Sequence, residues 1–265
     1  MVAIGGVGGS GTRLISQIFQ DLGYFMGSDL NDSEDTLLFT LLFKYTQILT
    51  TTDREFDQNL EIFIQIMNSE KPLSLAQFEY LHTLAANKRT LHAKEWLEER
   101  IRRISVGKPH DLWGWKEPNS HIVIERLFTR IDDLKFIYVY RHGLDMAYSD
   151  NQNQLKLWGG VFFNQQSIDI TPHNSFKYWC IVHRRILKLQ KDYPKRILML
   201  DYDQLCREPN GVLSELLAFI EYEHEYDIEA IKALIKTPSS IGRYRQFSLE
   251  NFSQKDLEFV KTLYT

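Results

Sequence analysis

The stretch GGVGGSGTR, residues 5–13, decides how the rest of the chain is interpreted. Five glycines lie within positions 5–11, after the apolar run MVAIG (1–5) and before a segment whose apolar residues recur at helical spacing. Backbone N–H groups in such a turn, together with the positive end of the next helix dipole, bind anions without a cationic side chain. The stretch therefore predicts a strand, a loop and a helix that hold a phosphate or sulfate group, although a glycine-rich turn also serves close packing alone.

The composition is that of an ordinary globular protein. The 265 residues carry a formal net charge of −4, with 43% hydrophobic and 25% charged residues. Such a chain has no global basic field, so nucleic acid is not expected as a partner. Cys180 and Cys206 lack metal-binding or redox spacing, and no metal site is predicted. We see no leader and no apolar run near the roughly 18–20 residues of a membrane span, so we expect a cytoplasmic protein without a membrane partner.

Short apolar runs rich in strand-forming residues occur at 1–5, 134–140 and 196–200, with a weaker one at 111–115. Each run is followed by a helical pattern, and this alternation is typical of a parallel sheet covered by helices. The sequence therefore predicts an α/β fold, with a P-loop-type parallel sheet flanked by helices in a single domain over residues 1–265.

A helical insertion follows the first strand and helix. Residues 33–107 contain helical patterns only, and Ser33, Asp57 and Ser74 are candidate N-caps. We expect this insertion to act as a lid on the acceptor side of the site. Aromatic residues of a stretch at 152–171, which we expect to be irregular, are predicted to shape the same pocket: Trp158, Phe162 and Phe163.

Two nucleotide-binding patterns compete for the glycine loop. GVGGSG (6–11) satisfies the dinucleotide pattern G-x-G-x-x-G, with Asp29 as the later acid, but helices follow where further strands are expected. The same stretch has the glycine spacing of a kinase-like P-loop using ATP and Mg²⁺, but Thr12 stands where the lysine belongs. Asp201, at the end of the run ILMLD, would hold the metal in that interpretation.

A second anion-binding pair follows the run at 134–140. Arg141 comes directly after this predicted strand, and Ser149 lies eight positions later, in a segment with helical character. A residue at a strand end and one about two turns into the next helix both face the crevice at the carboxyl edge of a sheet. An arginine with a hydroxyl partner suits a second phosphate.

Lys116 and Glu117, in WGWKEP (113–118), come directly after another predicted strand. A cation at this edge of the sheet would stabilise charge that develops on a transferring group. Further along, YDQLCREP begins at Tyr202, and Arg243 and Arg245 flank a tyrosine in a short basic segment that would fold over a nucleotide.

Together these stretches resemble the sulfotransferase family. In that family a turn of the form (K/R)SGTT binds the 5′-phosphosulfate of 3′-phosphoadenosine 5′-phosphosulfate (PAPS), and residues 9–13 are similar to it. An arginine followed eight residues later by a serine binds the 3′-phosphate, and Arg141 and Ser149 match that pair. Residues 116–118 are similar to the Lys-(Asp/Glu)-Pro element of the tyrosylprotein branch. Residues 202–209 are similar to the YEDL…P element of the family, and residues 241–245 to its late basic segment.

The resemblance implies transfer of a sulfuryl group from PAPS to a hydroxyl or amine acceptor by in-line displacement, with 3′-phosphoadenosine 5′-phosphate (PAP) as the leaving group. The acceptor would be a small molecule, a glycan or a peptide. Lys116 would stabilise the transition state. The implied donor-binding residues are Gly8, Gly9, Ser10, Gly11, Thr12 and Arg13 for the phosphosulfate, Arg141 and Ser149 with Arg243 or Arg245 for the 3′-phosphate, and Tyr202 near the nucleotide.

A general base must take the proton of the acceptor. The tyrosylprotein branch keeps its glutamate shortly after the loop, where this chain has GSDLNDSED (27–35). Asp29 is the first candidate, followed by Asp32, Glu34 and Glu117. His121 and His82 rank below these carboxylates because a lone histidine is more often structural.

Two positions depart from the family pattern. Gly9 replaces the usual Lys or Arg of the loop, and Arg13, in the first turn of the helix, is the candidate that supplies the missing charge. Asp201 stands where the family often has arginine, which keeps the metal-using kinase open as an alternative. A non-catalytic nucleotide-binding module is the other alternative, because the charge missing at Gly9 would then mean lost chemistry with retained binding.

Overall fold

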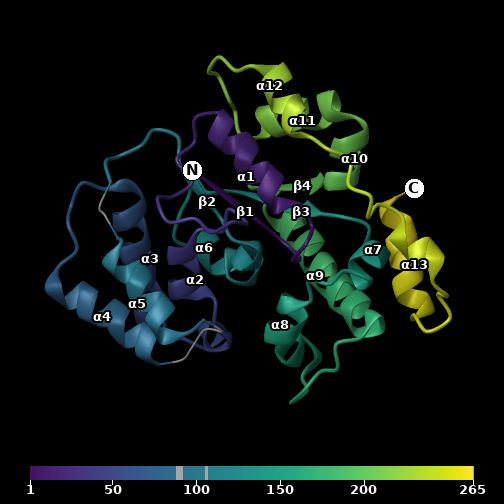
Figure 1. The fold of residues 1–265 in the computed structure, drawn as a ribbon, viewed down its shortest axis with the longest axis horizontal. Helices are drawn as coiled ribbons and strands as arrows, with labels where there is room; N and C mark the ends of the chain where they lie inside the picture. Colours follow the sequence, from purple (N-terminus) through teal and green to yellow (C-terminus); the bar gives the residue numbers. More distant parts are fainter. Residues whose placement is uncertain (88–91, 105–106, 265) are drawn as a thin grey trace.

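A parallel sheet flanked by helices forms the centre of the molecule (Figure 1). The structure is a computed structural model and describes residues 1–87, 92–104 and 107–264. Within these residues the sheet has four strands in the order β2-β1-β3-β4, and every neighbouring pair is parallel. The predicted α/β fold with a parallel sheet is therefore confirmed. The strands are β1 (Val2–Gly6), β2 (Gly114–Lys116), β3 (Lys135–Tyr140) and β4 (Ile197–Asp201).

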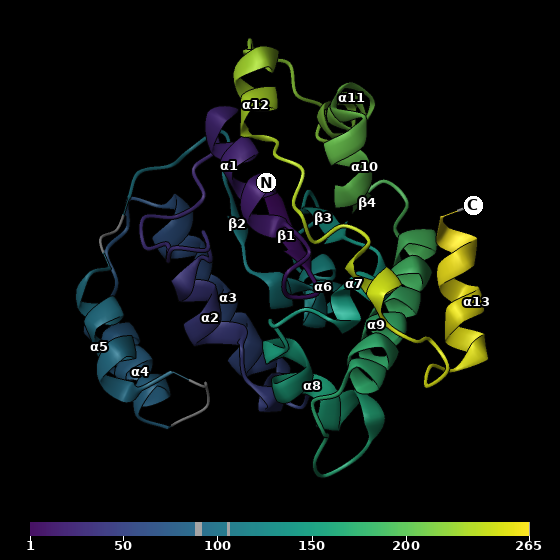
Figure 2. The ribbon, with the colours of Figure 1, turned by 45° about the vertical axis from the view of Figure 1, so that its right-hand side comes forward.

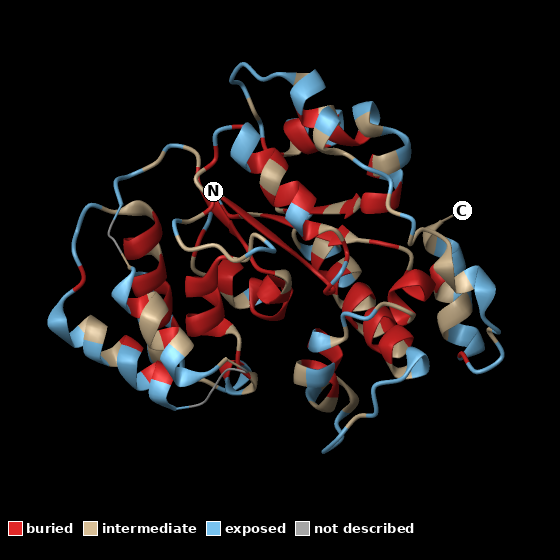
Figure 3. Cartoon of the chain, in the orientation of Figure 1, coloured by how far each residue is buried: buried red, intermediate tan, exposed pale blue. Residues whose placement is uncertain are grey.

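Side chains of the central strands alternate between two cores, because successive residues of a strand point to opposite faces. Val2 and Ile4 belong to one core and Ala3 to the other. Figure 3 shows both faces of the strands covered, as is usual for parallel sheets. The core with Val2 packs on α1 (Thr12–Asp21), α10 (Tyr202–Arg207), α11 (Pro209–Phe219) and α12 (Ile228–Leu234).

The core with Ala3 packs on the opposite group of helices, which lies below the sheet in Figure 2. These elements are η2 (Pro118–Ile122), α6 (Ile124–Phe128), α7 (Gly143–Ala147), α8 (Asn153–Phe163), α9 (Pro172–Asp192) and α13 (Gln254–Leu263). A short 3₁₀ turn, η3 (Arg243–Gln246), precedes α13. The prediction of an irregular stretch at 152–171 was wrong for its first half, because residues 153–163 form α8 and Trp158 is fully buried on it.

The helical insertion shares a core with the sheet. Phe39 stacks on Trp115 of β2 with ring centroids 5.7 Å apart, and Phe63 meets the same indole edge-on at 5.2 Å. These aromatic contacts hold the insertion against the edge strand and continue the hydrophobic core. The insertion contains α2 (Leu37–Phe43), η1 (Thr46–Leu49), α3 (Asp53–Asn68), α4 (Leu75–Ala86) and α5 (Lys94–Arg102).

One of the three predicted N-caps in the insertion is confirmed. Ser74 caps α4 in a capping box with Gln77. The other two predictions were wrong. Helix α3 begins one turn before Asp57, because the Thr52 side chain accepts a hydrogen bond from the N–H of Glu55. Helix α2 begins at Leu37, and residue 33 precedes it in a loop.

Among the described residues, no helix is both long and apolar enough to cross a bilayer.

Because two histidines are buried, we expect the folded protein to lose stability in acid. Burial, and then the charge of Arg185, lowers the pKa of His121 from 6.5 to about 3, and burial lowers the pKa of His183 from 6.5 to about 3. Between these values the unfolded chain binds more protons than the folded protein, so stability falls as the pH falls from 6.5 toward 3. At pH 5 each histidine is expected to lower the free energy of unfolding by about 2 kcal/mol relative to pH 7.

Urea unfolding at pH 7 and pH 5 measures this loss. His183→Phe keeps a ring against Trp179, on which His183 stacks at 4.4 Å, but cannot take up a proton. We expect this variant to lose distinctly less stability between the two pH values than the wild type. An equal loss in both proteins would contradict the assignment to His183.

Candidate active site

The four parallel strands bring the predicted site residues to one edge of the sheet. The glycine loop follows β1, Lys116 ends β2, Arg141 follows β3 and Tyr202 follows β4. Carboxyl ends of parallel strands lie at the same edge, which is the usual ligand-binding edge of open α/β sheets. Gly11 of the loop and Tyr202, which lie 191 positions apart in the chain, thus meet at one place.

The glycine loop closes tightly against its neighbours. Gly9 and Gly11 have left-handed backbone angles, with φ of +90° and +97°. A Cβ at Gly11 would lie 2.1 Å from a ring carbon of Tyr202, and a Cβ at Gly6 would lie 2.2 Å from the carbonyl oxygen of Val139. Glycine is therefore required for close approach at both positions, and α1 begins directly after the loop.

Polar groups of the loop are available to a ligand. In the described part of the chain, the N–H groups of Gly8, Gly9 and Gly11 donate no hydrogen bond, whereas Ser10 N–H donates to Val7 O at 3.1 Å. The buried Ser10 Oγ also has no partner among those residues. Native proteins satisfy almost all buried polar groups, so the unpartnered Ser10 Oγ, beside free N–H groups at the N-terminus of α1, fits an anionic group.

Gly11→Ala tests the close approach. An alanine there meets a strained backbone and the Tyr202 ring, whereas Gly23 has a φ of +84° with nothing within 4 Å of the Cβ position. Gly23→Ala is thus a control that carries the backbone strain alone, about 1 kcal/mol. Gly11→Ala is expected to lose about 1–3 kcal/mol more, the usual effect of overpacking. Urea unfolding of both variants measures the difference, and equal losses would contradict the proposed contact.

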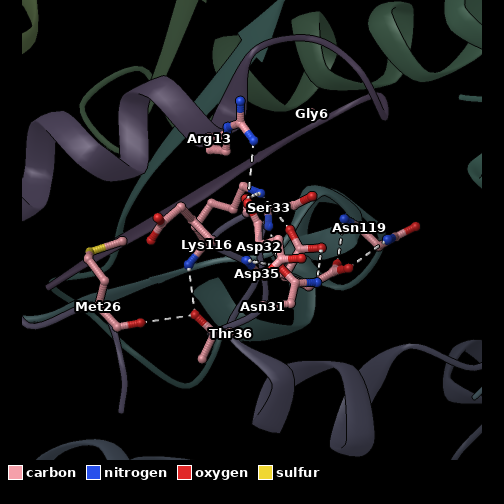
Figure 4. Close-up of polar contacts among 12 residues, drawn as sticks. Gly6, Arg13, Met26, Asn31, Asp32, Ser33, Asp35, Thr36, Lys116 and Asn119 are labelled. Carbon is pink, nitrogen blue, oxygen red and sulfur yellow. Dashed lines mark hydrogen bonds and ion pairs between the residues drawn. The ribbon is translucent and has the colours of Figure 1, made fainter. Parts of the chain in front are cut away.

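Lys116 is buried and ion-paired at the end of β2. Its side chain is 2% exposed, and Nζ donates to Asp35 Oδ1 and to Ser33 O, both at 2.5 Å (Figure 4). Asn31 Nδ2 donates to the other oxygen of Asp35 at 3.1 Å. Thr36 binds the backbone of Lys116 in both directions, with its Oγ1 accepting at 3.1 Å and its N–H donating at 2.7 Å. The segment before α2 is thus held against β2, and the Asp35 carboxylate is paired with the Lys116 ammonium group.

The carboxylate on Lys116 is Asp35, which was not among the residues we predicted from the sequence. Its stretch, 27–35, contains four acidic residues, and no local pattern distinguishes the one that meets a residue 81 positions later. Asp29, the first predicted base, forms an ion pair with Arg100 of α5 at 2.9 Å. The structure therefore does not bring Asp29 into contact with Lys116.

Glu117, the other predicted catalytic carboxylate, is completely buried and fully engaged. Its Oε1 lies 2.8 Å from Lys44 Nζ, and its oxygens accept hydrogen bonds from the backbone and side-chain nitrogens of Asn119 at 2.6 and 2.9 Å. Burial alone would lower the pKa of Lys44, but the charge and hydrogen bond of Glu117 and the charge of Asp35 outweigh it and raise that pKa. Glu117 thus caps η2 and neutralises Lys44.

Three pockets lie around the glycine loop. The central pocket, about 260 Å³, is bounded by the loop, Lys116, Asp35 and Arg13. The Tyr202 pocket, about 420 Å³, shares Gly11 and Arg13 with it and extends to α12. The Lys44 pocket, about 240 Å³, shares Asp35, Pro118 and Asn151 with the central pocket. The central pocket therefore lies between the other two.

Arg13 and Lys116 both line the central pocket. The Arg13 guanidinium, exposed on the first turn of α1, donates from Nη1 to the carbonyl oxygen of Asp32 at 3.4 Å (Figure 4). Arg13 therefore brings a positive charge to the glycine loop, where Gly9 provides none.

Arg141 lies beside Tyr202 and forms an ion pair with Asp203. Its Nε donates to Asp203 Oδ1 at 3.1 Å, its Nη2 donates to Ser240 Oγ at 3.1 Å, and its guanidinium carbon lies 5.3 Å from the Tyr202 ring centre. Ser149 follows the short helix α7 instead of lying within a helix, and its Oγ would be 3.3 Å from a Cβ at Gly9. Within the described ranges no hydrogen bond joins Arg141 to Ser149, and each lies next to part of the loop site.

The late basic segment packs on α7, next to the end of β3 (Figure 2). Asp145 of α7 accepts hydrogen bonds from the N–H groups of Gly242 at 2.7 Å and Tyr244 at 3.1 Å. Arg243 donates to the carbonyl oxygens of Tyr148 and Ser240. Arg245, the other predicted arginine, lies within the same 3₁₀ turn η3. Asp145 could not be recognised from the sequence, because its role depends on a contact 97 positions away.

Asp201, the metal ligand of the kinase interpretation, acts as the N-cap of α10. Its Oδ1 accepts from the N–H groups of Asp203 at 2.8 Å and Gln204 at 3.1 Å. Among the residues that the structure describes, no group of three or more His, Cys, Asp or Glu side chains is arranged to hold a metal ion.

Comparisons with known proteins place the chain in a family. The profile of the family described as "Sulfotransferase family" matches residues 2–226. No curated protein matches the chain. Among solved structures, the sulfotransferase domain of the Synechococcus PCC 7002 olefin synthase is 14% identical, with a TM-score of 0.54 over 100% of this chain and 94% of that chain.

Two other solved structures are also similar. Sulfotransferase STF9 from Mycobacterium avium is 13% identical, with a TM-score of 0.49 over 99% of this chain and 75% of that chain. Mouse sulfotransferase SULT7A1, solved in complex with PAP, is 12% identical, with a TM-score of 0.42 over 100% of this chain and 82% of that chain. Because the family profile covers most of the chain, this protein belongs to the sulfotransferase family.

Proposed function

We propose that the protein transfers a sulfuryl group from PAPS to a hydroxyl or amine acceptor. The observation that carries this proposal is the central pocket, in which a buried lysine, a carboxylate and an anion-binding glycine loop face one another. Membership of the sulfotransferase family supports the same reaction. PAPS supplies an activated sulfuryl group that is linked to a phosphate.

The proposed donor site runs from the central pocket into the Tyr202 pocket. The N–H groups of Gly8, Gly9 and Gly11, with Ser10 and Thr12 and the N-terminus of α1, would hold the phosphosulfate. The Tyr202 pocket, which opens from Gly11 and Arg13, would take the adenosine. Burial raises the pKa of Tyr202 to about 12, so its hydroxyl stays protonated at neutral pH and can donate a hydrogen bond.

Arg141 is the proposed partner of the 3′-phosphate. Its Nη1 forms no hydrogen bond with the described residues and is available to an anion, while Asp203 and Ser240 hold the other two nitrogens. Ser149, Arg243 and Arg245 remain the supporting candidates for this phosphate. A charge-assisted contact of this kind would distinguish PAPS from nucleotides without a 3′-phosphate.

The chemical step is assigned to Lys116 and Asp35. The acceptor oxygen or nitrogen forms a bond to sulfur while the bond from sulfur to the bridging phosphate oxygen breaks. Lys116 would stabilise the charge that develops on the transferring group and leaving oxygen. Asp35 lines both the central and the Lys44 pocket, and it would take the proton of the acceptor. In this assignment Asp35 replaces Asp29 as our first candidate for the general base.

Binding of PAP tests the donor assignment. We expect PAP without Mg²⁺ to raise the melting temperature, because a ligand at about 100 times its Kd stabilises the folded state by about 2.7 kcal/mol. Arg141→Ala is expected to abolish this shift. The variant leaves Asp203 unpaired and lowers the melting temperature itself, so the measured quantity is the difference with and without PAP. Stabilisation by ATP and Mg²⁺ but not by PAP would contradict the donor assignment and favour a kinase.

A further inference from the structure

The Lys44 pocket has the position of an acceptor site. It meets the central pocket at Asp35, Pro118 and Asn151, so an acceptor seated there would reach the transferring group from the side opposite the Tyr202 pocket. Its walls come from the glycine loop, the insertion, η2 and the start of α8. Seven of the ten described residues that line it have polar or charged side chains.

The floor of this pocket is a fixed polar network. Asn119 donates to Glu117 at 2.9 Å and accepts from Trp158 Nε1 at 2.7 Å. Gln154 donates to Gly6 O at 2.8 Å and accepts a hydrogen bond from Tyr178 at 3.3 Å. Because both amides have partners on each side, their orientations are fixed and they support the pocket without needing a ligand.

The rim of the pocket has unused hydrogen-bonding groups. The side chain of Asn153 and the Nδ2 of Asn151 form no hydrogen bond to any residue in the described ranges, and both side chains are exposed at the pocket. Asp35 faces them as an acceptor. The rim therefore offers amide donors and acceptors opposite a carboxylate, which is the chemistry that binds several hydroxyl groups.

The charges in the pocket balance. Lys44 is neutralised by Glu117 at 2.8 Å, and Asp35 by Lys116 at 2.5 Å. Burial, and then the charge of Lys44, lowers the pKa of His92 and keeps the ring neutral, although Glu117 and Asp35 oppose this shift. A strongly charged acceptor would lose its hydration shell without finding an unpaired opposite charge.

We infer that the Lys44 pocket binds a neutral, polyhydroxylated acceptor, namely a single sugar ring or a polyol of that size. This inference rests on the proposed function for the transfer step but not for the binding step. The volume of about 240 Å³ lies below the roughly 300–1,000 Å³ of sites for drug-sized ligands, which favours one small unit. The polar rim disfavours phenols and long-chain alcohols, because their apolar surface would leave the amides of Asn151 and Asn153 without partners.

Calorimetry with the protein saturated with PAP tests the binding step. The probes are methyl glucoside and myo-inositol, compared with 4-nitrophenol and 1-octanol. We expect the two polyols to bind more tightly than the phenol and the alkanol. Asn153→Leu is expected to weaken polyol binding about fivefold to tenfold, the effect of losing one neutral hydrogen bond. Lys156→Leu, on the same helix but outside the pocket, is the matched control and should leave polyol binding unchanged.

Release of PAP from PAPS with the same four acceptors tests the transfer step. Turnover with the polyols, and a raised KM for them in Asn153→Leu with an unchanged KM for PAPS, would support the inference. Turnover with 4-nitrophenol or 1-octanol but not with the polyols would overturn it while leaving the proposed function intact. Polyol binding without any turnover would overturn the proposed transfer reaction but would support the Lys44 pocket as a polyol-binding site. Equal polyol binding by Asn153→Leu and the wild type would overturn the site itself.

Discussion

Asp35→Asn is expected to lower kcat for sulfuryl transfer by about 10²- to 10⁴-fold, the usual contribution of a general base. The substitution keeps the shape of the side chain, but one amide oxygen replaces the two oxygens that accept from Lys116 and Asn31, and an amide cannot take the proton of the acceptor. Asp35 lies about one-sixth exposed at the junction of the central and Lys44 pockets, so it is accessible to an acceptor. Steady-state release of PAP measures the change, and the PAP-induced thermal shift should remain.

Two neighbouring carboxylates provide controls. Asp32 is exposed in the same turn, and Asp29 is paired with Arg100 on the insertion. Asp32→Asn and Asp29→Asn are expected to change kcat much less than Asp35→Asn. A larger loss in Asp29→Asn than in Asp35→Asn would contradict the assignment to Asp35 and restore Asp29 as the base.

Lys116→Met is expected to lower kcat by about 10²- to 10³-fold, as does the loss of a single donor to a developing charge. Methionine fills much of the volume of the buried side chain without its ammonium group. PAP binding should change little, because the loop amides and Arg141 hold the donor in the proposed site. Loss of the PAP-induced thermal shift in Lys116→Met would instead make Lys116 a ground-state binding residue.

The double variant separates two roles of Asp35, because contacting residues need not act additively. If Asp35 only positions the ammonium of Lys116, with which it forms a 2.5 Å contact, then Asp35→Asn should have no further effect on Lys116→Met. We expect a further loss of kcat in the double variant, because the acceptor proton still needs a base. The same transfer assay measures all four proteins.

The strands and the glycine loop could be predicted from the sequence because their signals are local. A strand of a parallel sheet is a short apolar run, and the runs at 1–5, 134–140 and 196–200 overlap β1, β3 and β4. The loop after β1 is recognisable from its five glycines within residues 5–11. Ser74 was recognised as an N-cap for the same reason, because its partner Gln77 lies three residues away.

Other features could not be predicted because their partners lie far away in the chain. Ser33 is a plausible N-cap by its type, but its carbonyl oxygen accepts from Lys116, 83 positions later, and the helix starts at Leu37. Residues 153–163 form a helix whose packing includes a hydrogen bond from Trp158 to Asn119, 39 positions earlier. In both places tertiary contacts overrule the local pattern.

The sequence by itself determined the class of fold, the strand–loop–helix that can bind an anion, and the placement of Lys116, Arg141 and Tyr202 at strand ends. Only the tertiary structure decided that Asp35, rather than Asp29, meets Lys116, and that three pockets join around the loop. The physical reason is the range of the interactions. Backbone angles and apolar periodicity act over a few residues, whereas an ion pair between residues 81 positions apart forms only when the insertion packs on β2.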